Sequence, residues 1–365
     1  MSIVLYKKGE EALQRPHEET IMLIDIHGHF TTLPESVSSF RNAQIDTFDK
    51  TGLAPDIALP VISDKQITDA LESNQIRVMK ERGVDLTVFS PKASAMDHHR
   101  GNEQTNVVWT KLCNDLVHRA CLLFPQHFVG ACQLPQVSGQ PPRDAVIEEL
   151  RRCVTAHGCV AANLNPDPSG GYWLDPPLSD KAWWYPLFEE LVALDVPAMI
   201  HVTGSCNPHF HTTATHYINA DTTAFVQFLT STIFQDFPTL KFVIPHGGGA
   251  VPFHWGRYRG LAQDMGLPDL SEKVLKNVFF DTCVYHQAGI DLMLKVLPSE
   301  NILFGSEIFG AIKGVDPTTG HYFDDVRRYV DQSEHGTPAI RQQIFSSNAQ
   351  RVYPRLKPFL ACRAC

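Results

Sequence analysis

Eight short apolar segments, rich in β-branched and aromatic residues, recur along the chain, and this repetition constrains the fold most. The predicted strands are residues 22–29, 85–89, 128–132, 159–164, 197–202, 240–246, 277–282 and 301–307. A helix or a helical stretch follows each strand, and nearly continuous apolar runs are typical of parallel strands that are buried on both faces. The sequence therefore predicts the α/β class, as a single (β/α)8 TIM barrel.

An open, doubly wound sheet is the alternative for a chain of alternating strands and helices. Such a sheet commonly binds a dinucleotide through a Gly-x-Gly-x-x-Gly turn after its first strand. No such motif follows the first predicted strand. The sequence therefore gives dinucleotide binding no support.

The segments between the strands carry helical spacing of apolar residues. Helices are predicted at residues 64–82, 104–124, 143–156, 184–194 and 220–234, and Gly83 provides a stop for the first of them. The polar, proline-containing segment from residue 30 to residue 60 is instead predicted to be a long loop. Loops of that length often cover an active site.

Composition limits the partners of this chain. It has 365 residues, 43% of them hydrophobic and 19% charged, and a formal net charge of -9. This acidic balance argues against nucleic acid and anionic membranes as partners, and no run approaches the ~18 apolar residues of a membrane span. Nine cysteines, an odd number, favour free thiols in a reducing compartment. We therefore expect a cytoplasmic protein.

Three regions are expected along the chain. Residues 1–20 contain an apolar run too short for a signal peptide and several glutamates, so they are predicted to be an N-terminal extension. Residues 21–356 would form the catalytic barrel. Residues 357–365, which end in Cys362-Arg363-Ala364-Cys365, are predicted to be a frayed C-terminal tail.

The first strand ends in Asp25-Ile26-His27-Gly28-His29. Side chains two apart on a strand share a face, so the two imidazoles, with Asp25 behind them, are expected to converge on one spot. Gly28 lets the backbone or a ligand approach closely. A bare His-x-His pair is more often two polar residues at a strand exit, so it needs support from the rest of the chain.

That support comes from other strand ends. His201 ends the fifth predicted strand, His246 the sixth and Glu307 the eighth. In a (β/α)8 barrel all these ends meet at the face that holds the active site. Each residue alone has a structural explanation, but together they favour one divalent metal ion. Nitrogen and oxygen ligands suit zinc first, with manganese possible, and such a metal activates water.

With these residues in view, the chain from about residue 21 to residue 356 resembles the amidohydrolase superfamily. The resemblance lies in the branch of the aminocarboxymuconate-semialdehyde and γ-resorcylate decarboxylases, and is greatest to the 4-oxalomesaconate hydratase subgroup of protocatechuate and gallate degradation. The segments that carry it are residues 90–96, 163–168, 201–208, 244–260 and 304–307. The decarboxylases and most amidohydrolases have aspartate at the end of the eighth strand, where this chain has Glu307.

The resemblance implies roles for individual residues. The zinc ligands would be His27, His29, His201 and Glu307. Glu307 would also act as a base, and His246 or Tyr217 would donate a proton. Residues expected to bind a small anionic carboxylate substrate are Lys92, Arg257, Arg259 and Asn163, with Asn165 as a further orienting group. Lys92 stands where an arginine is expected, which keeps the charge but loses the bidentate fork.

Other functions remain open at this point. The same site could support a metal-dependent, non-oxidative decarboxylation of an aromatic or dienoic acid, or the hydrolysis of a lactone or amide. A barrel that has lost catalysis and serves as a binding protein is a further alternative. A homo-oligomer, most simply a dimer, is expected.

Overall fold

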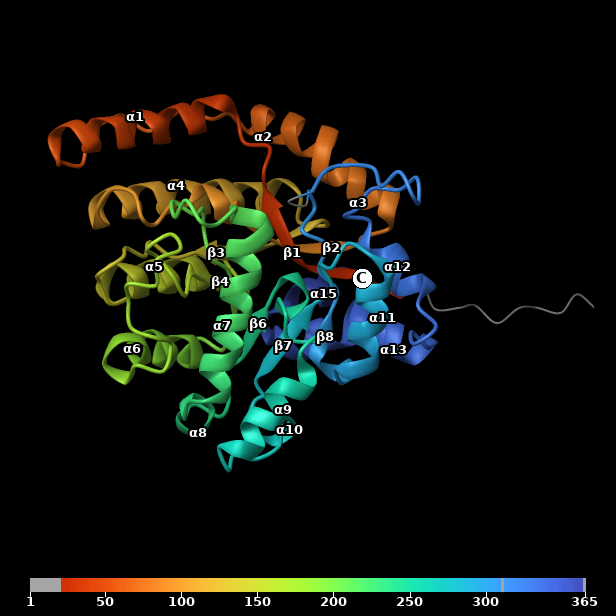
Figure 1. The fold of residues 1–365 in the computed structure, drawn as a ribbon. Coiled ribbons are helices and arrows are strands. Elements are labelled where there is room, and N and C mark those ends of the chain that lie inside the picture. Colours follow the sequence, from red (N-terminus) through yellow and green to blue (C-terminus); the bar gives the residue numbers. More distant parts are fainter. Residues whose placement is uncertain (1–20, 310–311, 364–365) are drawn as a thin grey trace, which may run out of the picture.

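The computed structural model describes residues 21–309 and 312–363, and its centre is one parallel sheet of eight strands in the order β1 to β8. Figure 1 shows the strands at the centre with helices around them. The strands are β1 (Ile24–Phe30), β2 (Leu86–Pro91), β3 (Phe128–Gln133), β4 (Ala161–Leu164), β5 (Ala198–Ile200), β6 (Phe242–Ile244), β7 (Val278–Asp281) and β8 (Ile302–Leu303).

The first and last strands meet, which closes the sheet. The amide of Ile26 donates to the carbonyl of Phe304 over 2.9 Å, and Gly28 forms a parallel bridge with Ile308. Closure removes the open edges that a doubly wound sheet would have. The predicted (β/α)8 barrel is therefore confirmed.

The helices lie between successive strands. They are α1 (Glu35–Thr51), α2 (Asp64–Leu71), α3 (Arg77–Arg82), α4 (Glu103–Leu123), α5 (Asp144–Thr155), α6 (Lys181–Ala193), α7 (Tyr217–Leu229), α8 (Ile233–Asp236), α9 (Trp255–Asp264), α10 (Leu270–Lys273), α11 (Gln287–Val296), α12 (Val326–Gln332), α13 (Pro338–Gln342), α14 (Asn348–Val352) and α15 (Lys357–Arg363). The predicted helix 64–82 is α2 and α3 joined by a π-helical turn, and it ends at Gly83 with φ 64°. The predicted helix 220–234 is divided into α7 and α8.

The prediction of a loop from residue 30 to residue 60 is wrong for its middle part, because α1 covers residues 35–51. The buried side of this helix has the expected spacing, at Val37, Phe40, Arg41, Gln44 and Ile45. Two of these five residues are polar, so the apolar periodicity is weak. They can be buried because Arg41 donates to Gln44 Oε1 and to Asn106 Oδ1, which satisfies most of their polar atoms. Nε of Arg41 has no hydrogen-bond partner among the described residues.

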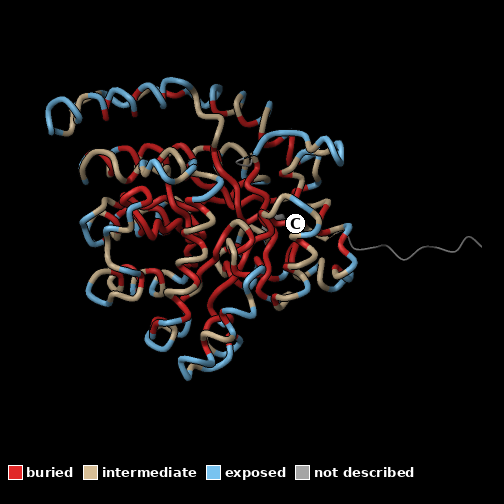
Figure 2. Tube along the Cα trace, viewed as in Figure 1, coloured by how far each residue is buried: buried red, intermediate tan, exposed pale blue. Residues whose placement is uncertain are grey.

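Two large apolar clusters hold the barrel together, and Figure 2 shows buried residues gathered along the central strands. One fills the space between the strands and the surrounding helices. The other lies inside the barrel, where inward side chains such as Ile24 and Val243 pack against Tyr353 and Leu356 from the end of the chain. Phe359 and Leu360 of α15 also pack there, so residues 357–361 are helical and attached to the barrel. The expected N-terminal extension lies outside the described residues.

Arg41 provides a stability test of α1. We expect Arg41→Ala to lower the free energy of unfolding by about 2–4 kcal/mol, because it opens a cavity and leaves the buried oxygens of Asn106 and Met96 without their donor. Urea denaturation would measure the change. Lys50→Ala, at an exposed position in the last turn of the same helix, should change the value by less than about 0.5 kcal/mol. Equal effects of the two substitutions would contradict this account.

Candidate metal centre

The two histidines of β1 point to the same side of the strand, as the period-two rule requires. The pairing of β1 with β2 has a register shift between Asp25 and Gly28. A Cβ atom at Gly28 would overlap the methyl group of Thr87, so only glycine lets β1 pass this close to β2. The local irregularity thus brings His27 and His29 to the open end of the barrel.

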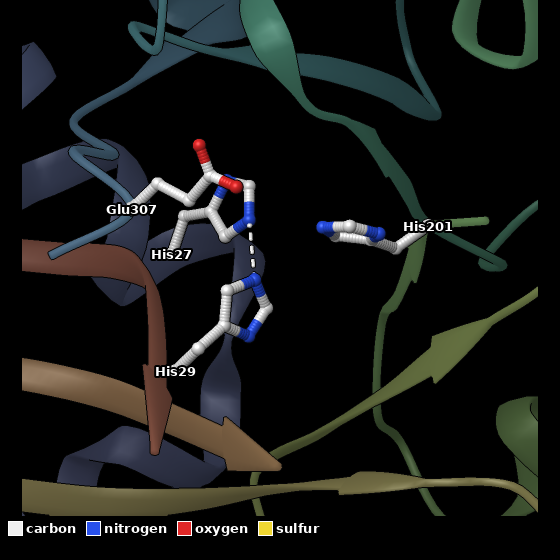
Figure 3. A group of neighbouring side chains, drawn as sticks. All are labelled: His27, His29, His201 and Glu307. Atoms are coloured by element: carbon white, nitrogen blue, oxygen red, sulfur yellow. Dashed lines mark hydrogen bonds between the residues drawn. The ribbon is translucent and has the colours of Figure 1, made fainter. Parts of the chain in front are cut away.

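Four side chains from three strand ends converge there, and all four are buried. One ligand atom from each of His27, His29, His201 and Glu307 lies within 4.8 Å of the other three. Figure 3 shows the three rings and the carboxylate turned toward a common space. The predicted convergence of these four residues is confirmed.

The hydrogen bonds on the far side of each ring decide which nitrogen faces this space. Nδ1 of His27 lies 2.7 Å from Asp281 Oδ2, and Nδ1 of His201 lies 2.8 Å from the carbonyl of Val202. A carboxylate and a carbonyl only accept, so both Nδ1 atoms carry the proton and both Nε2 atoms present a lone pair. Nδ1 of His29 contacts Ser90 Oγ at 2.8 Å. Such outer partners typically fix metal-binding imidazoles.

The arrangement fits a divalent metal ion. Nε2 of His27 and Nε2 of His29 are only 3.0 Å apart, and Nε2 of His201 is buried with no hydrogen-bond partner among the described residues. Ser90 Oγ can accept from Nδ1 of His29, and the third Nε2 then also presents a lone pair to a cation. Burial lowers the pKa of His29 to about 3, and burial likewise lowers the pKa of His201. Neutral imidazole is the form that binds a metal.

Glu307 supplies the anionic member of the set. Burial alone would raise its pKa, but the hydrogen bond and positive charge of His246 outweigh burial and keep the pKa well below its usual range. Tyr285 donates a short hydrogen bond to Oε2 of Glu307. Both residues have left-handed backbone conformations, with φ 58° at Glu307 and 65° at Tyr285. Strain of this kind concentrates at functional sites, where the surrounding fold maintains it.

His246 lies directly after β6, also with a positive φ of 51°. Its Nδ1 is 2.9 Å from Asp221 Oδ2, and its Nε2 is 3.9 Å from Glu307 Oε1. Burial alone would lower its pKa, but the charge of Asp221, with Glu307, raises the pKa well above the usual value. The ring of Tyr217 stacks on that of His246 with centroids 5.0 Å apart. His246 and Tyr217 therefore form one unit beside the ligand cluster.

Asp25 does not share the position of the imidazoles. Its carboxylate accepts from the amides of His27 and Ser306 and from the hydroxyl of Ser306. It therefore connects β1 with the chain that leaves β8, below the metal site.

A cavity of about 170 Å³ opens above the ligand cluster. Its walls include His29, Thr31, Lys92, Ala93, Ser94, Thr213, Tyr217, Glu307, Phe309 and Lys313. The volume is well below the ~300–1,000 Å³ of drug-sized pockets, so it suits a small metabolite. Of the residues predicted to bind substrate, Lys92 lines this cavity.

The remaining predicted substrate-binding residues lie elsewhere. Arg257 and Arg259 are exposed on α9, where Arg259 lies 3.9 Å from Asp269, and neither is in the cavity wall. The turn at Gly247 to Gly249 carries the chain away from the site before α9 begins, which sequence proximity to His246 did not reveal. Asn163 donates to Ser90 Oγ over 3.2 Å, so it supports the partner of His29.

Sequence reasoning missed several residues that hold the site, namely Asp281, Asp221, Ser90 and Tyr285. Asp281 had a signal, because it ends β7 at the same barrel face as the histidines. Asp221 lies within a helix, and Tyr285 lies in a loop. Nothing in the sequence pattern links either residue to the site. Asn165 donates to Thr203 and contacts His98, beside the site.

A closed (β/α)8 barrel with three histidines and one carboxylate at the carboxyl ends of its strands defines a class of metal-dependent barrel proteins. Residues 24–355 match the family model described as amidohydrolase. The chain belongs to the amidohydrolase family.

Individual relatives agree with this assignment. The chain is 52% identical over 343 residues, covering 94% of this chain and 99% of the relative, to a 2-keto-4-carboxy-3-hexenedioate hydratase of Sphingobium sp. (strain NBRC 103272 / SYK-6). The crystal structure of a 4-oxalomesaconate hydratase from Rhodopseudomonas palustris superposes with a TM-score of 0.87 at 50% identity, covering 94% of this chain and 99% of that one. A dihydroxybenzoic acid decarboxylase from Polaromonas sp. JS666, solved with bound manganese, shares the fold at 20% identity, with a TM-score of 0.66 and coverage of 92% and 97%.

Metal content tests the ligand set. We expect Asp281→Asn to weaken metal binding by roughly 10- to 100-fold, because it removes only the outer partner of the ligand His27. His201→Ala should weaken metal binding by more than that, because it removes a ligand itself. Plasma mass spectrometry after dialysis against a weak chelator would measure the bound metal. His254→Ala, at an exposed histidine, should retain the wild-type content. Full retention by His201→Ala would contradict the proposed centre.

Proposed function

We propose that this protein is a metal-dependent hydratase, a hydro-lyase that adds water to an unsaturated oxo-tricarboxylate of the 4-oxalomesaconate type. Such a reaction belongs to the breakdown of aromatic acids such as protocatechuate and gallate. The observation that carries the proposal is Glu307, a buried carboxylate held between the imidazole cluster and the cavity. The 52% identity to a hydratase over nearly the whole chain supports it.

The metal is proposed to be zinc, with manganese as the alternative. Three imidazoles and one carboxylate, with no thiolate among them, suit zinc, and a related decarboxylase structure contains manganese. When bound, a divalent cation would supply a Lewis acid that makes water a better nucleophile near neutral pH.

Glu307 is proposed to remove the proton from the attacking water. Its low pKa keeps it ionised, and Tyr285 fixes Oε2, which leaves Oε1 on the side of His246. The oxygen of water then adds to one carbon of the double bond, and the electron pair moves into the conjugated oxo and carboxylate groups. A carboxylate that is already oriented needs little reorganisation during this step.

His246 or Tyr217 is proposed to donate the proton that the second carbon receives. The raised pKa of His246 means that its imidazole carries a proton at neutral pH. Burial raises the pKa of Tyr217, so its phenol hydroxyl also stays protonated. Tyr217 lines the cavity and therefore contacts the substrate directly. Asp221 orients the ring of His246.

The carboxylate-binding residues follow from the cavity. Lys92 is proposed to hold one substrate carboxylate, whereas Asn163 acts through Ser90 on the orientation of His29. Arg257 and Arg259 would reach a substrate only if the chain moved or a partner subunit contributed them, and we assign them no role.

The oligomeric state and the cellular compartment of the enzyme are also proposed. No helix among the described residues has the length and apolar character to cross a bilayer. Val61 is 94% exposed and Leu53 71% exposed, and both lie in the segment between α1 and α2. A homo-oligomer, most simply a dimer, is proposed because most oligomers are symmetric homo-oligomers. The free buried thiols favour the cytoplasm.

The base role of Glu307 can be tested by substitution. Glu307→Gln should reduce turnover by about 10²- to 10⁴-fold in protein that retains its metal, because the amide cannot accept the proton from water. Stopped-flow absorbance at the conjugated band of the substrate would measure turnover, with metal content determined on the same samples. Near-normal turnover in the metal-loaded variant would rule out this role.

The reaction class can be tested on the wild-type enzyme. With 4-oxalomesaconate we expect the conjugated ultraviolet absorbance to disappear without release of carbon dioxide, and one atom of ¹⁸O from labelled water to enter the product. Mass spectrometry and a carbon dioxide electrode would measure both outcomes. Gas release with an aromatic acid such as γ-resorcylate, and no hydration, would instead establish the decarboxylase. Wild-type protein that is inactive toward every acid tested and free of bound metal would establish a binding protein.

A further inference from the structure

The cavity above the metal centre has two lysines in its wall, and only one of them was expected from the sequence. Lys92 follows β2, and Lys313 lies in the loop after β8. In the closed barrel, β1 lies between these two strands, since β1 pairs with β2 and meets the end of β8. The lysines therefore stand on the two sides of the strand that carries His27 and His29.

Lys313 is tied to the cavity by a neighbouring ring. Its Nζ lies 5.9 Å from the ring centroid of Phe309, which also lines the cavity. A contact of this length lets an ammonium group rest over an aromatic face. No carboxylate in the described part of the chain comes within ion-pair distance of Lys92 or Lys313, in contrast to Lys65 and Lys181, which are paired with Asp69 and Asp236.

The ligand cluster at the bottom of the cavity, here called the floor, has too little net positive charge to bind a substrate with several carboxylates. Two buried carboxylates, Glu307 and Asp281, lie at or directly behind the ligand cluster, and a divalent cation would be offset by them. His246 is paired with Asp221, so this pair adds no net charge. The whole chain carries a formal charge of -9. A substrate with three carboxylates therefore needs cations in the cavity wall.

We propose that Lys92 and Lys313 form a two-lysine clamp that binds the substrate carboxylates farthest from the metal centre and makes the site selective for tricarboxylates over dicarboxylates. The identity of the physiological substrate rests on the proposed hydratase function, but the clamp itself is a binding property. Lysine acts as a point charge on a flexible stem, so the clamp tolerates carboxylates at different angles.

The clamp can be tested by binding alone. Tricarballylate and glutarate share a five-carbon chain and differ by one carboxylate. The ratio of their affinities therefore measures how strongly the protein recognises the third carboxylate. Isothermal titration calorimetry of zinc-loaded wild-type protein should show tighter binding of tricarballylate. Lys313→Ala and Lys92→Ala should each weaken tricarballylate binding by about 10-fold, as expected for a lost charge-assisted contact, and glutarate binding by less.

Matched variants separate recognition from folding. Lys276→Ala, at an exposed lysine outside the cavity, should bind both acids like the wild type, and Lys313→Arg should retain most of the tricarballylate affinity. The losses in the alanine variants should shrink at high ionic strength, where charges are screened. Thermal melting and metal content, measured in parallel, establish that each variant is folded and loaded.

Two results would overturn the clamp. One is an unchanged ratio of tricarballylate to glutarate affinity in folded, metal-loaded Lys313→Ala, and the other is a wild-type protein that does not distinguish the two acids. Failure of the hydratase function is a separate outcome, because it would appear as the absence of water addition in wild-type protein that still prefers tricarballylate.

Discussion

The hydrogen bonds on the outer nitrogens of three imidazoles are the interactions on which the site depends. Asp281 and the carbonyl of Val202 hold the protons of His27 and His201 on the outer nitrogens. The inner nitrogens of these two rings then present lone pairs, and Nε2 of His29 lies 3.0 Å from Nε2 of His27. Such an arrangement suits a cation, so the outer hydrogen bonds shape the metal centre as much as its ligands do.

The barrel provides the means to maintain this arrangement. The residues around the site leave their strands in left-handed conformations at His246, Tyr285 and Glu307, which cost energy locally. Below them, Asp25 joins β1 to Ser306, and the apolar interior reaches down to Tyr353. The packed end of the barrel thus supplies rigidity, while the opposite end carries the strained residues that face the cavity.

How much the sequence could predict depends on whether a residue lies on a regular element. His27, His29, His201 and Glu307 were predictable, because parallel strands in a closed barrel all end at one face. Asp281 obeys the same rule and could have been included.

Other parts of the structure are fixed by tertiary contacts that no local pattern contains. Helix α1 was missed because two of its buried positions hold Arg41 and Gln44, whose burial depends on partners such as Asn106 far along the chain. Arg257 and Arg259 follow His246 closely in sequence, yet the glycine turn directs them to the surface. Tyr285 reaches Glu307 only through the fold of its loop.

The ligand cluster at the floor of the cavity and the residues of its wall have different roles. The floor, built from strand ends, carries the ligand set, whose proposed task is to activate water or hold an oxygen of the substrate, as many reactions of carboxylic acids require. The wall is built from the segments after β1, β2, β5 and β8, and under the proposed clamp it selects which acid reaches that floor. A barrel that keeps this floor and changes Lys92, Lys313 or Tyr217 is therefore expected to act on a different acid, because function is determined by the site and not by the fold.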